Sequence, residues 1–180
     1  VNIDDEQIDR GLLAALRTIE DQRCIDQVCA VWLGSRDDRL GALLEWGGWI
    51  ASGPDRLALL TALKAGRLER FEQAGAEVVE PLLQASQDPD LTVAGRARQA
   101  LRDLQNPAAQ EEFYRLILET DHPSARELAA AVPYAPLEPK SRAIFYLLTE
   151  QWDRYDDLDF DRSRALYELE PRLAESDYGA

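Results

Sequence analysis

Hydrophobic residues recur at three- and four-residue intervals along most of the chain, which is the spacing of one face of an α-helix. The clearest example lies in residues 76–104. Its two halves carry, in order, Val78, Val79, Leu82, Leu83 and Ala85, and then Leu91, Val93, Ala94, Ala97, Ala100, Leu101 and Leu104. No segment alternates convincingly between hydrophobic and polar residues. The pattern therefore predicts an all-α chain without a sheet.

The two halves are separated by the turn Asp88-Pro89-Asp90. Pro89 lacks an N–H and disfavours the α conformation at Asp88, so we expect the first helix to end before it. Asp90 is a good cap for the next helix. Two short helices with small residues on their packing side cannot bury these faces alone. They need further helical hairpins beside them, as in an α-solenoid.

The same spacing predicts helices on both sides of this hairpin. They are expected at about residues 4–19, 22–33, 37–51, 54–65 and 67–74, then from Asn106-Pro107 to about 118, from Pro123 to about 132, at 140–149, and in shorter segments between Trp152 and Leu173. Three prolines, Pro133, Pro136 and Pro139, exclude a long helix between about 133 and 139.

The second helix of the central hairpin resembles that of a HEAT repeat, in which Val, Ala and Ala-Leu follow an Asp-Pro turn at fixed offsets. These places are held by Val93, Ala97, Ala100 and Leu101. HEAT repeats usually have Arg or Lys directly after the Val. This chain has Ala94 there, and Arg96 follows two residues later.

A second and weaker copy of the pattern runs from Asp121 to Val132. It carries a basic residue at the expected place, Arg126, and Ala129 holds the first Ala place. The step from Val93 to Ala125 is 32 residues, which is about one repeat.

A wider stretch, about residues 30–161, is similar to bacterial HEAT-like regions that are attached to other modules, notably WD-repeat propellers, in multidomain proteins. The similarity is carried by the segments 63–69, 74–83, 144–155 and 158–161. It implies a right-handed α-solenoid of HEAT- or armadillo-like hairpins that forms a single domain over residues 1–180. Irregular repeats would occupy 1–74, the clearest repeats 75–149, and a C-terminal cap 150–180. The resemblance supports a scaffold and carries over no activity.

The charge of the chain narrows the choice of partner. Acidic residues number 34 and basic residues 20, which gives a formal net charge of −14, and both halves are acidic. Such a field repels phosphate backbones and anionic membranes, so neither is an expected partner. It favours a protein or peptide with a basic face. No apolar run reaches the ~18 residues of a membrane span, and no signal peptide opens the chain.

Few residues are candidates for catalysis, disulfide formation or metal binding. Cys24 and Cys29 are expected on different faces of one helix, where a mutual disulfide is awkward, and free buried thiols fit a reducing cytoplasm. The single histidine, His122, has no evident nucleophile to serve. Acids from Asp157 to Glu168 occupy places of an EF-hand-like calcium loop, but Arg162 stands where glycine is needed. The sequence therefore predicts no catalytic residue, no metal and no cofactor.

The leading hypothesis is a non-catalytic, cytoplasmic scaffold that binds a protein or peptide, or another domain of its own parent chain. The start at Val1 without Met indicates either processing or a fragment of a longer chain. Alternatives are a HEAT-fold enzyme acting on nucleic acid or attaching a bilin pigment, and a simple spacer or intramolecular clamp. The excess of acids disfavours the nucleic-acid enzyme.

Four residues are predicted to contact the partner. Arg96 and Arg126 would set its charge preference through rim contacts, although either could instead form a salt bridge within its repeat. Trp46 and Trp49 would form an aromatic anchor, or else fill space between helices. Trp152 and Tyr155 pose the same choice.

Overall fold

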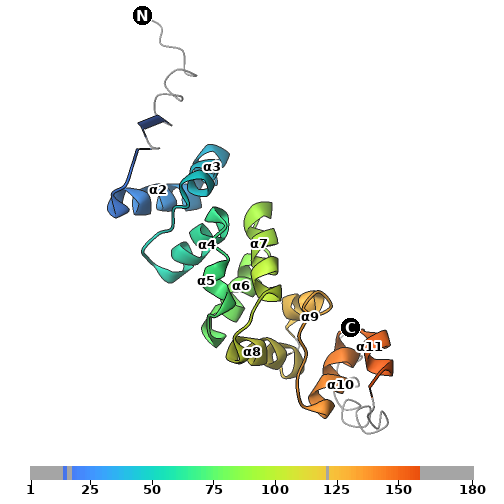
Figure 1. Cartoon of the computed structure of the whole chain (residues 1–180). Coiled ribbons are helices and arrows are strands. Elements are labelled where there is room, and N and C mark those ends of the chain that lie inside the picture. The colour runs from blue at the N-terminus through green and yellow to red at the C-terminus, as the bar shows by residue number, and fades with distance from the viewer. Residues whose placement is uncertain (1–13, 16–17, 121, 159–180) are drawn as a thin grey trace, which may run out of the picture. The chain divides into compact units, whose positions relative to one another are not determined.

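The computed structural model describes residues 14–15, 18–120 and 122–158 (Figure 1). Within these residues the fold is all-α and contains no strand, as predicted. The elements are α2 (Gln22–Ser35), α3 (Asp38–Gly47), α4 (Asp55–Ala65), α5 (Glu69–Glu72), the 3-10 helix η1 (Ala76–Val78), α6 (Val79–Ala85), α7 (Leu91–Arg102), α8 (Pro107–Leu118), α9 (Pro123–Ala129), α10 (Pro139–Leu148) and α11 (Trp152–Asp156). None of these helices is long and apolar enough to cross a membrane.

Most helices begin where the sequence supplies a side-chain cap. Oδ1 of Asp90 accepts hydrogen bonds from the N–H groups of Thr92 and Val93 at 2.9 and 3.2 Å, so the predicted cap of α7 is confirmed. Asp21, Asp37, Asn106 and Glu138 cap α2, α3, α8 and α10 in the same way.

Several predicted boundaries were wrong, and α9, for example, ends at Ala129 instead of about residue 132. The third helix was expected to continue to Ser52-Gly53, but α3 ends at Gly47 because Gly48 takes the left-handed conformation (φ 62°). Pro54 was expected to be the first helical residue of α4, and it is the residue before the helix. Of the helix predicted at 4–19, residues 4–13 and 16–17 lie outside the described residues, as do residues 159–173 of the C-terminal segments.

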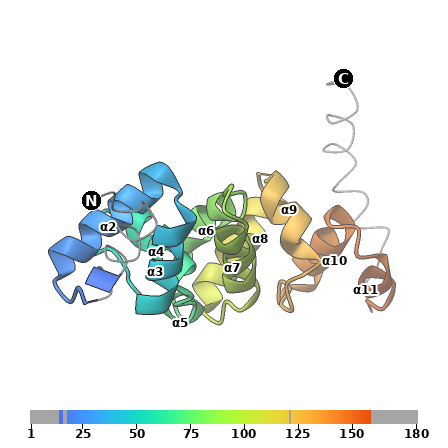
Figure 2. The same cartoon turned by 90° about the horizontal axis from the view of Figure 1, so that it is seen from above.

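The chain divides into two compact units, and the prediction of one continuous stack stays a prediction. Unit 1 contains residues 1–72 and 80–100, and unit 2 contains residues 73–79 and 101–180. In unit 1, α2, α3 and α4 pack on one another (Figure 2). Its fully buried side chains include Trp32, Leu44, Leu63, Leu82, Leu83 and Val93.

In unit 2, α8 packs against η1, α9 and α10, and α10 packs against α11. Aromatic rings form its centre. Tyr134 meets the rings of Phe113 and Tyr114 edge-on, with centroids 5.9 and 5.8 Å apart. Phe145 makes the same kind of contact with Tyr114 and Tyr146, at 5.6 and 5.8 Å. The hydroxyl of Tyr134 donates a 2.6 Å hydrogen bond to the carbonyl of Leu101, which satisfies its polar end inside the core.

Candidate binding site

The two tryptophans predicted as an aromatic anchor have different surroundings. Trp49 is 7% exposed and belongs to the core of unit 1, whereas Trp46 is 61% exposed. Gly47 explains part of this difference, because a Cβ at that position would collide with the indole of Trp49. Only Trp46 of this pair therefore presents its ring to a partner, while Trp49 fills space between helices.

The other aromatic pair divides in the same way. Tyr155 is 6% exposed and packs with Ala143 in unit 2, whereas Trp152 is 55% exposed at the start of α11. Each unit thus buries one aromatic ring of its pair and exposes the other.

Arg96 is used within unit 1. Its guanidinium Nη1 donates to the carbonyls of Leu63, at 3.1 Å, and Lys64 at the end of α4. The same nitrogen lies 3.5 Å from Oε1 of Glu45 on α3. The side chain therefore caps one helix and pairs with another, which supports the salt-bridge interpretation, and its contact with a partner stays a prediction.

Lys64 stands beside Arg96 and is the charged residue that the sequence analysis missed. Its side chain is 9% exposed, and its Nζ lies 2.9 Å from Oδ2 of Asp90 and 3.6 Å from Oε1 of Glu45. Two cations and two carboxylates thus form one network that joins α3, α4 and the start of α7. A signal was present, because Lys64 falls in the hydrophobic stripe of α4, four residues after the buried Leu60.

A second ion pair holds the same turn. Arg36, which ends α2 with a left-handed φ of 54°, donates from Nη2 to Oδ2 of Asp88 at 2.7 Å. Its guanidinium also lies over the ring of Trp32, with Cζ 4.9 Å from the ring centroid. Both acids of the turn Asp88-Pro89-Asp90 are therefore paired with bases inside unit 1, and we assign these charges a structural role.

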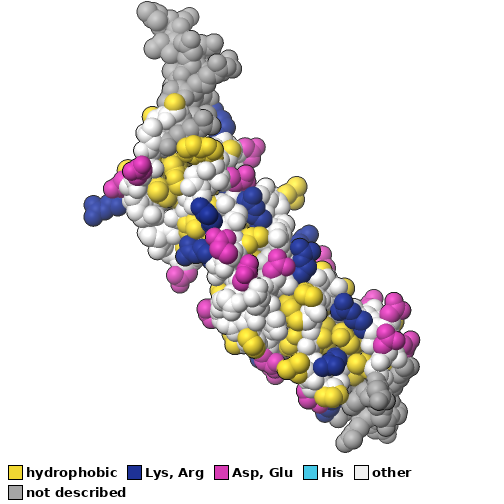
Figure 3. All heavy atoms as spheres, in the orientation of Figure 1, with side chains coloured by type: hydrophobic (Ala, Val, Ile, Leu, Met, Phe, Trp, Pro, Cys, Tyr) yellow, Lys and Arg dark blue, Asp and Glu magenta, His cyan; other side chains and the backbone are white. Residues whose placement is uncertain are grey.

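Arg126 lies in a different setting. It lines an open groove in unit 2, together with Glu127 of α9, with Ala130 just after α9, and with Thr149 and Glu150 just after α10. The groove has a volume of about 530 Å³. Figure 3 shows hydrophobic side chains exposed among charged ones over α9 and α10. The walls of this groove combine apolar and charged groups, as expected of a binding site.

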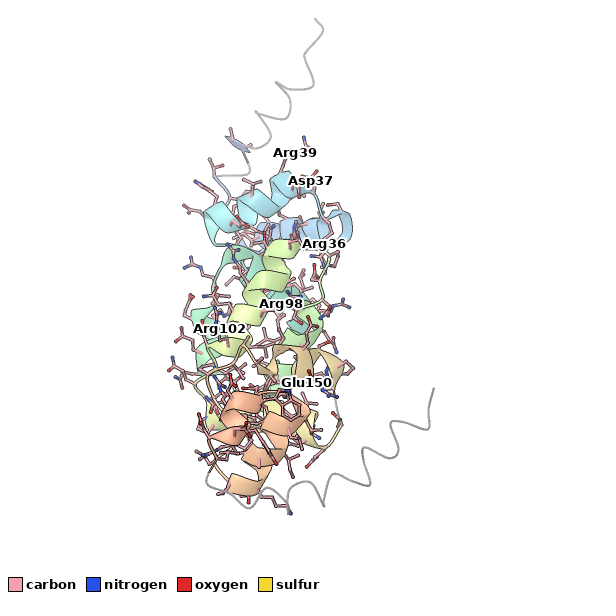
Figure 4. The ribbon with its side chains drawn as sticks, turned by 90° about the vertical axis from the view of Figure 1, so that its right-hand side faces the viewer. Arg36, Asp37, Arg39, Arg98, Arg102 and Glu150 are labelled. Carbon is pink, nitrogen blue, oxygen red and sulfur yellow. The ribbon has the colours of Figure 1, made fainter. Side chains whose placement is uncertain are left out.

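The groove continues along α11. A second part of about 300 Å³ shares Ala130 and Glu150 with the first and extends to Trp152, Asp153 and Arg154. Figure 4 labels Glu150 at the junction of α10 and α11. The exposed tryptophan of unit 2 thus lies at the end of a groove that carries both signs of charge. Spacing along the sequence did not indicate this groove, because it depends on how α9 and α11 pack.

The remaining chemical candidates have structural roles or lie outside the described residues. Cys29 is buried, and burial raises the pKa of its thiol to about 11, so it stays protonated at neutral pH. Cys24 is exposed, so the expectation that both thiols are buried was wrong for it. Nδ1 of His122 accepts a 3.4 Å hydrogen bond from the N–H of Ala125 and so caps α9.

No group of three or more His, Cys, Asp or Glu residues that could hold a metal occurs in the described ranges. Of the calcium loop considered between Asp157 and Glu168, only Asp157 and Leu158 lie in those ranges. Comparison of the chain with protein-family models, with curated proteins and with solved structures found no match.

Proposed function

We propose that this chain is a HEAT-like α-solenoid that binds a protein or peptide partner and has no catalytic role. The observation that carries the proposal is a recurring spacing of hydrogen bonds. In unit 1, Arg96 donates to the carbonyls of Leu63 and Lys64, 33 and 32 residues earlier. In unit 2, Tyr134 donates to the carbonyl of Leu101, 33 residues earlier.

Further bonds in unit 2 have the same spacing. The side chains of Gln73 and Gln105 are joined across 32 residues at 2.7 Å, and Nδ2 of Asn106 donates to the carbonyl of Gln73 across 33 residues at 3.0 Å. A spacing of 32 or 33 residues that recurs in both units is expected where equivalent places of successive repeats meet, and it supports the proposal. The spacing of 32 or 33 residues agrees to within one residue with the 32-residue step between the two sequence copies.

The surfaces of both units support binding over catalysis. The charged network of Lys64, Asp90, Glu45 and Arg96 is internally paired, and so does not offer a free acid and base to a substrate. Trp46 and Trp152 expose large rings, and such rings are common anchors at protein interfaces. The net charge of −14 favours a partner with a basic face, supplied by another protein or by another domain of the same parent chain.

Photo-cross-linking tests the proposal. A photoreactive amino acid replaces Trp46 in one version of the full chain and Trp152 in another, and a third version carries it at the exposed Leu137 of unit 2. We expect one of the first two versions to give a cross-linked product of defined mass with a specific protein, while the third does not. Labelling that is equal at all three positions, or no product in any, would contradict the proposal.

A further inference from the structure

The groove of unit 2 has the features of a pocket for a positively charged side chain. Glu127, Glu150 and Asp153 place three carboxylates along it, and Trp152 adds an exposed aromatic ring. The described part of the chain provides no ion pair for any of these three carboxylates. Arg154, by contrast, donates from Nη1 to Oε1 of Gln151 at 2.9 Å, so this guanidinium is already engaged.

The backbone conformation of Glu150 also supports a role in binding. Glu150 has a φ of 56°, in the left-handed region that glycine adopts most easily, and it directly follows Thr149, the C-terminal cap of α10. The N–H of Gln151 bonds to the carbonyl of Tyr146 at 2.9 Å, the pattern of a helix end that usually carries glycine. A side chain here costs about 1 kcal/mol.

Arg36 of unit 1 shows what compensates for such a conformation. It is the other described non-glycine residue with a positive φ, and its side chain bonds to Asp88 and lies over Trp32. Glu150 has no comparable contact among the described residues. Because no described residue compensates this backbone strain, we assign the Glu150 side chain a role in binding.

We propose that this groove binds a lysine or arginine side chain of an extended peptide segment of the partner, with its cation near Glu150 and Asp153 and its alkyl chain against Trp152. Charge favours a basic occupant, because the three carboxylates outnumber Arg126 and Arg154 along the groove, and no other described residue forms an ion pair with these carboxylates. The ring of Trp152 adds a cation–π attraction. The inference rests on the proposed function, since a protein partner supplies the side chain.

The test uses the indole N–H signals of the isotope-labelled full chain, which has four tryptophans. Three short capped peptides of the form Ala-Xaa-Ala are titrated, with lysine, norleucine or glutamate in the middle. Norleucine has the alkyl chain of lysine without its charge. We expect the lysine peptide to shift the signal of Trp152, assigned with W152F, and to bind about fivefold more tightly than the norleucine peptide. The glutamate peptide should shift nothing.

Trp46 is the matched control because it is exposed to a similar extent, 61% against 55%, but lies outside the groove. Its signal should stay in place. Equal shifts at Trp46 and Trp152, or equal binding of the lysine and norleucine peptides, would overturn the inference.

Glu150→Gly separates binding from folding. It removes a carboxylate of the groove and places glycine where the backbone favours it, so the lysine peptide should bind about two- to fivefold more weakly while the protein is no less stable. Unchanged binding would overturn the inference, as would a clear loss of stability. If the lysine peptide does not bind but photo-cross-linking captures a partner, only the assignment of the groove is wrong. If the peptides bind and no partner is captured, the proposed function falls.

Discussion

The interior of unit 1 and the interior of unit 2 are stabilised by different kinds of interaction. In unit 1, ion pairs connect separate helices, as when Lys64 of α4 meets Asp90 before α7 and Glu45 of α3. In unit 2, edge-to-face aromatic contacts connect α8, α10 and the segment around Tyr134, and Arg115 pairs with Glu112 and Glu119 of its own helix. An ion pair needs one particular partner in one position, whereas ring packing gains its energy mainly from buried area.

This difference indicates which changes should destabilise each unit. The charged network of unit 1 depends on the protonation of its acids, and loss of one partner leaves another charge poorly solvated. The aromatic core of unit 2 does not depend on pH over the ordinary range, but it is sensitive to loss of volume. We therefore expect variants to act through volume in unit 2 and through charge in unit 1.

The largest effect is expected for Phe145→Ala in unit 2. Phe145 is 0% exposed and contacts the rings of Tyr114 and Tyr146, so truncation leaves a cavity and should lower the free energy of unfolding by about 3–5 kcal/mol. Urea denaturation measures this loss. Leu137→Ala is the control, because Leu137 is 90% exposed and its removal should change stability by less than about 0.5 kcal/mol. Similar losses in the two variants would show that ring packing does not hold unit 2 together.

Lys64→Ala should have the next largest effect, about 2–4 kcal/mol, because it leaves Asp90 and Glu45 without their shared cation. Arg115→Ala removes a base whose side chain is 44% exposed, so its ion pairs are screened by water and its loss should change stability far less. Thermal and urea denaturation of both variants give the comparison. A Lys64→Ala variant no less stable than Arg115→Ala would contradict the structural role of the network.

The pH dependence of unit 1 should follow Asp90. Burial alone would raise the pKa of its carboxyl group, but the hydrogen bond and charge of Lys64, with the N–H groups of Val93 and Thr92, outweigh burial and lower that pKa. A pKa lowered by folding means that the ionised group contributes stability above its unfolded pKa of about 3.9. This contribution is lost as the pH falls through the folded pKa.

Asp90→Asn tests this dependence because asparagine still caps a helix but does not ionise. The variant should be less stable than the wild type at pH 7, and the difference should shrink as the pH falls below about 4. Urea denaturation at pH 7, 4 and 3 measures it. A difference that stays constant over this range would exclude Asp90 as a source of acid sensitivity.

The positions of the helices could be predicted from the sequence because caps and helix breakers act locally. Asp90 and Asn106 precede helices as expected, and Gly66 ends one. The end of α3 was missed because Trp46 and Ile50 continue the helical spacing, although Gly48 already stops the helix. The spacing of hydrophobic residues does not report backbone conformation, so it did not reveal that Gly48 is left-handed.

The candidate site was harder to predict because it depends on packing between helices. Spacing placed Trp46 and Trp49 near one helix end but did not show that one ring is buried and the other exposed. Arg96 was noticed for its place in a repeat, but its bonds to the end of α4 require the position of another helix. No pattern in the sequence selected Glu150, because its candidacy depends on its positive φ and on the groove that it lines.

The smallest effect is expected from two glycines in unit 1 that differ in their surroundings. Gly95 lies on the exposed side of α7, and a Cβ there would meet no atom within 4 Å. Gly95→Ala should raise the free energy of unfolding by about 0.5–1 kcal/mol, because alanine loses less entropy in a helix. Gly41→Ala is the matched control. Its Cβ would lie 2.7 Å from Cε of the ion-paired Lys64 and 3.2 Å from Nε1 of Trp32, so it should destabilise the protein.

These two substitutions add the same methyl group to helices of one unit, so opposite signs would show that the charged network leaves no space around Lys64. Urea denaturation of both variants measures the signs. If Gly41→Ala were also stabilising, Lys64 would have room to move and its network would be looser than its distances indicate.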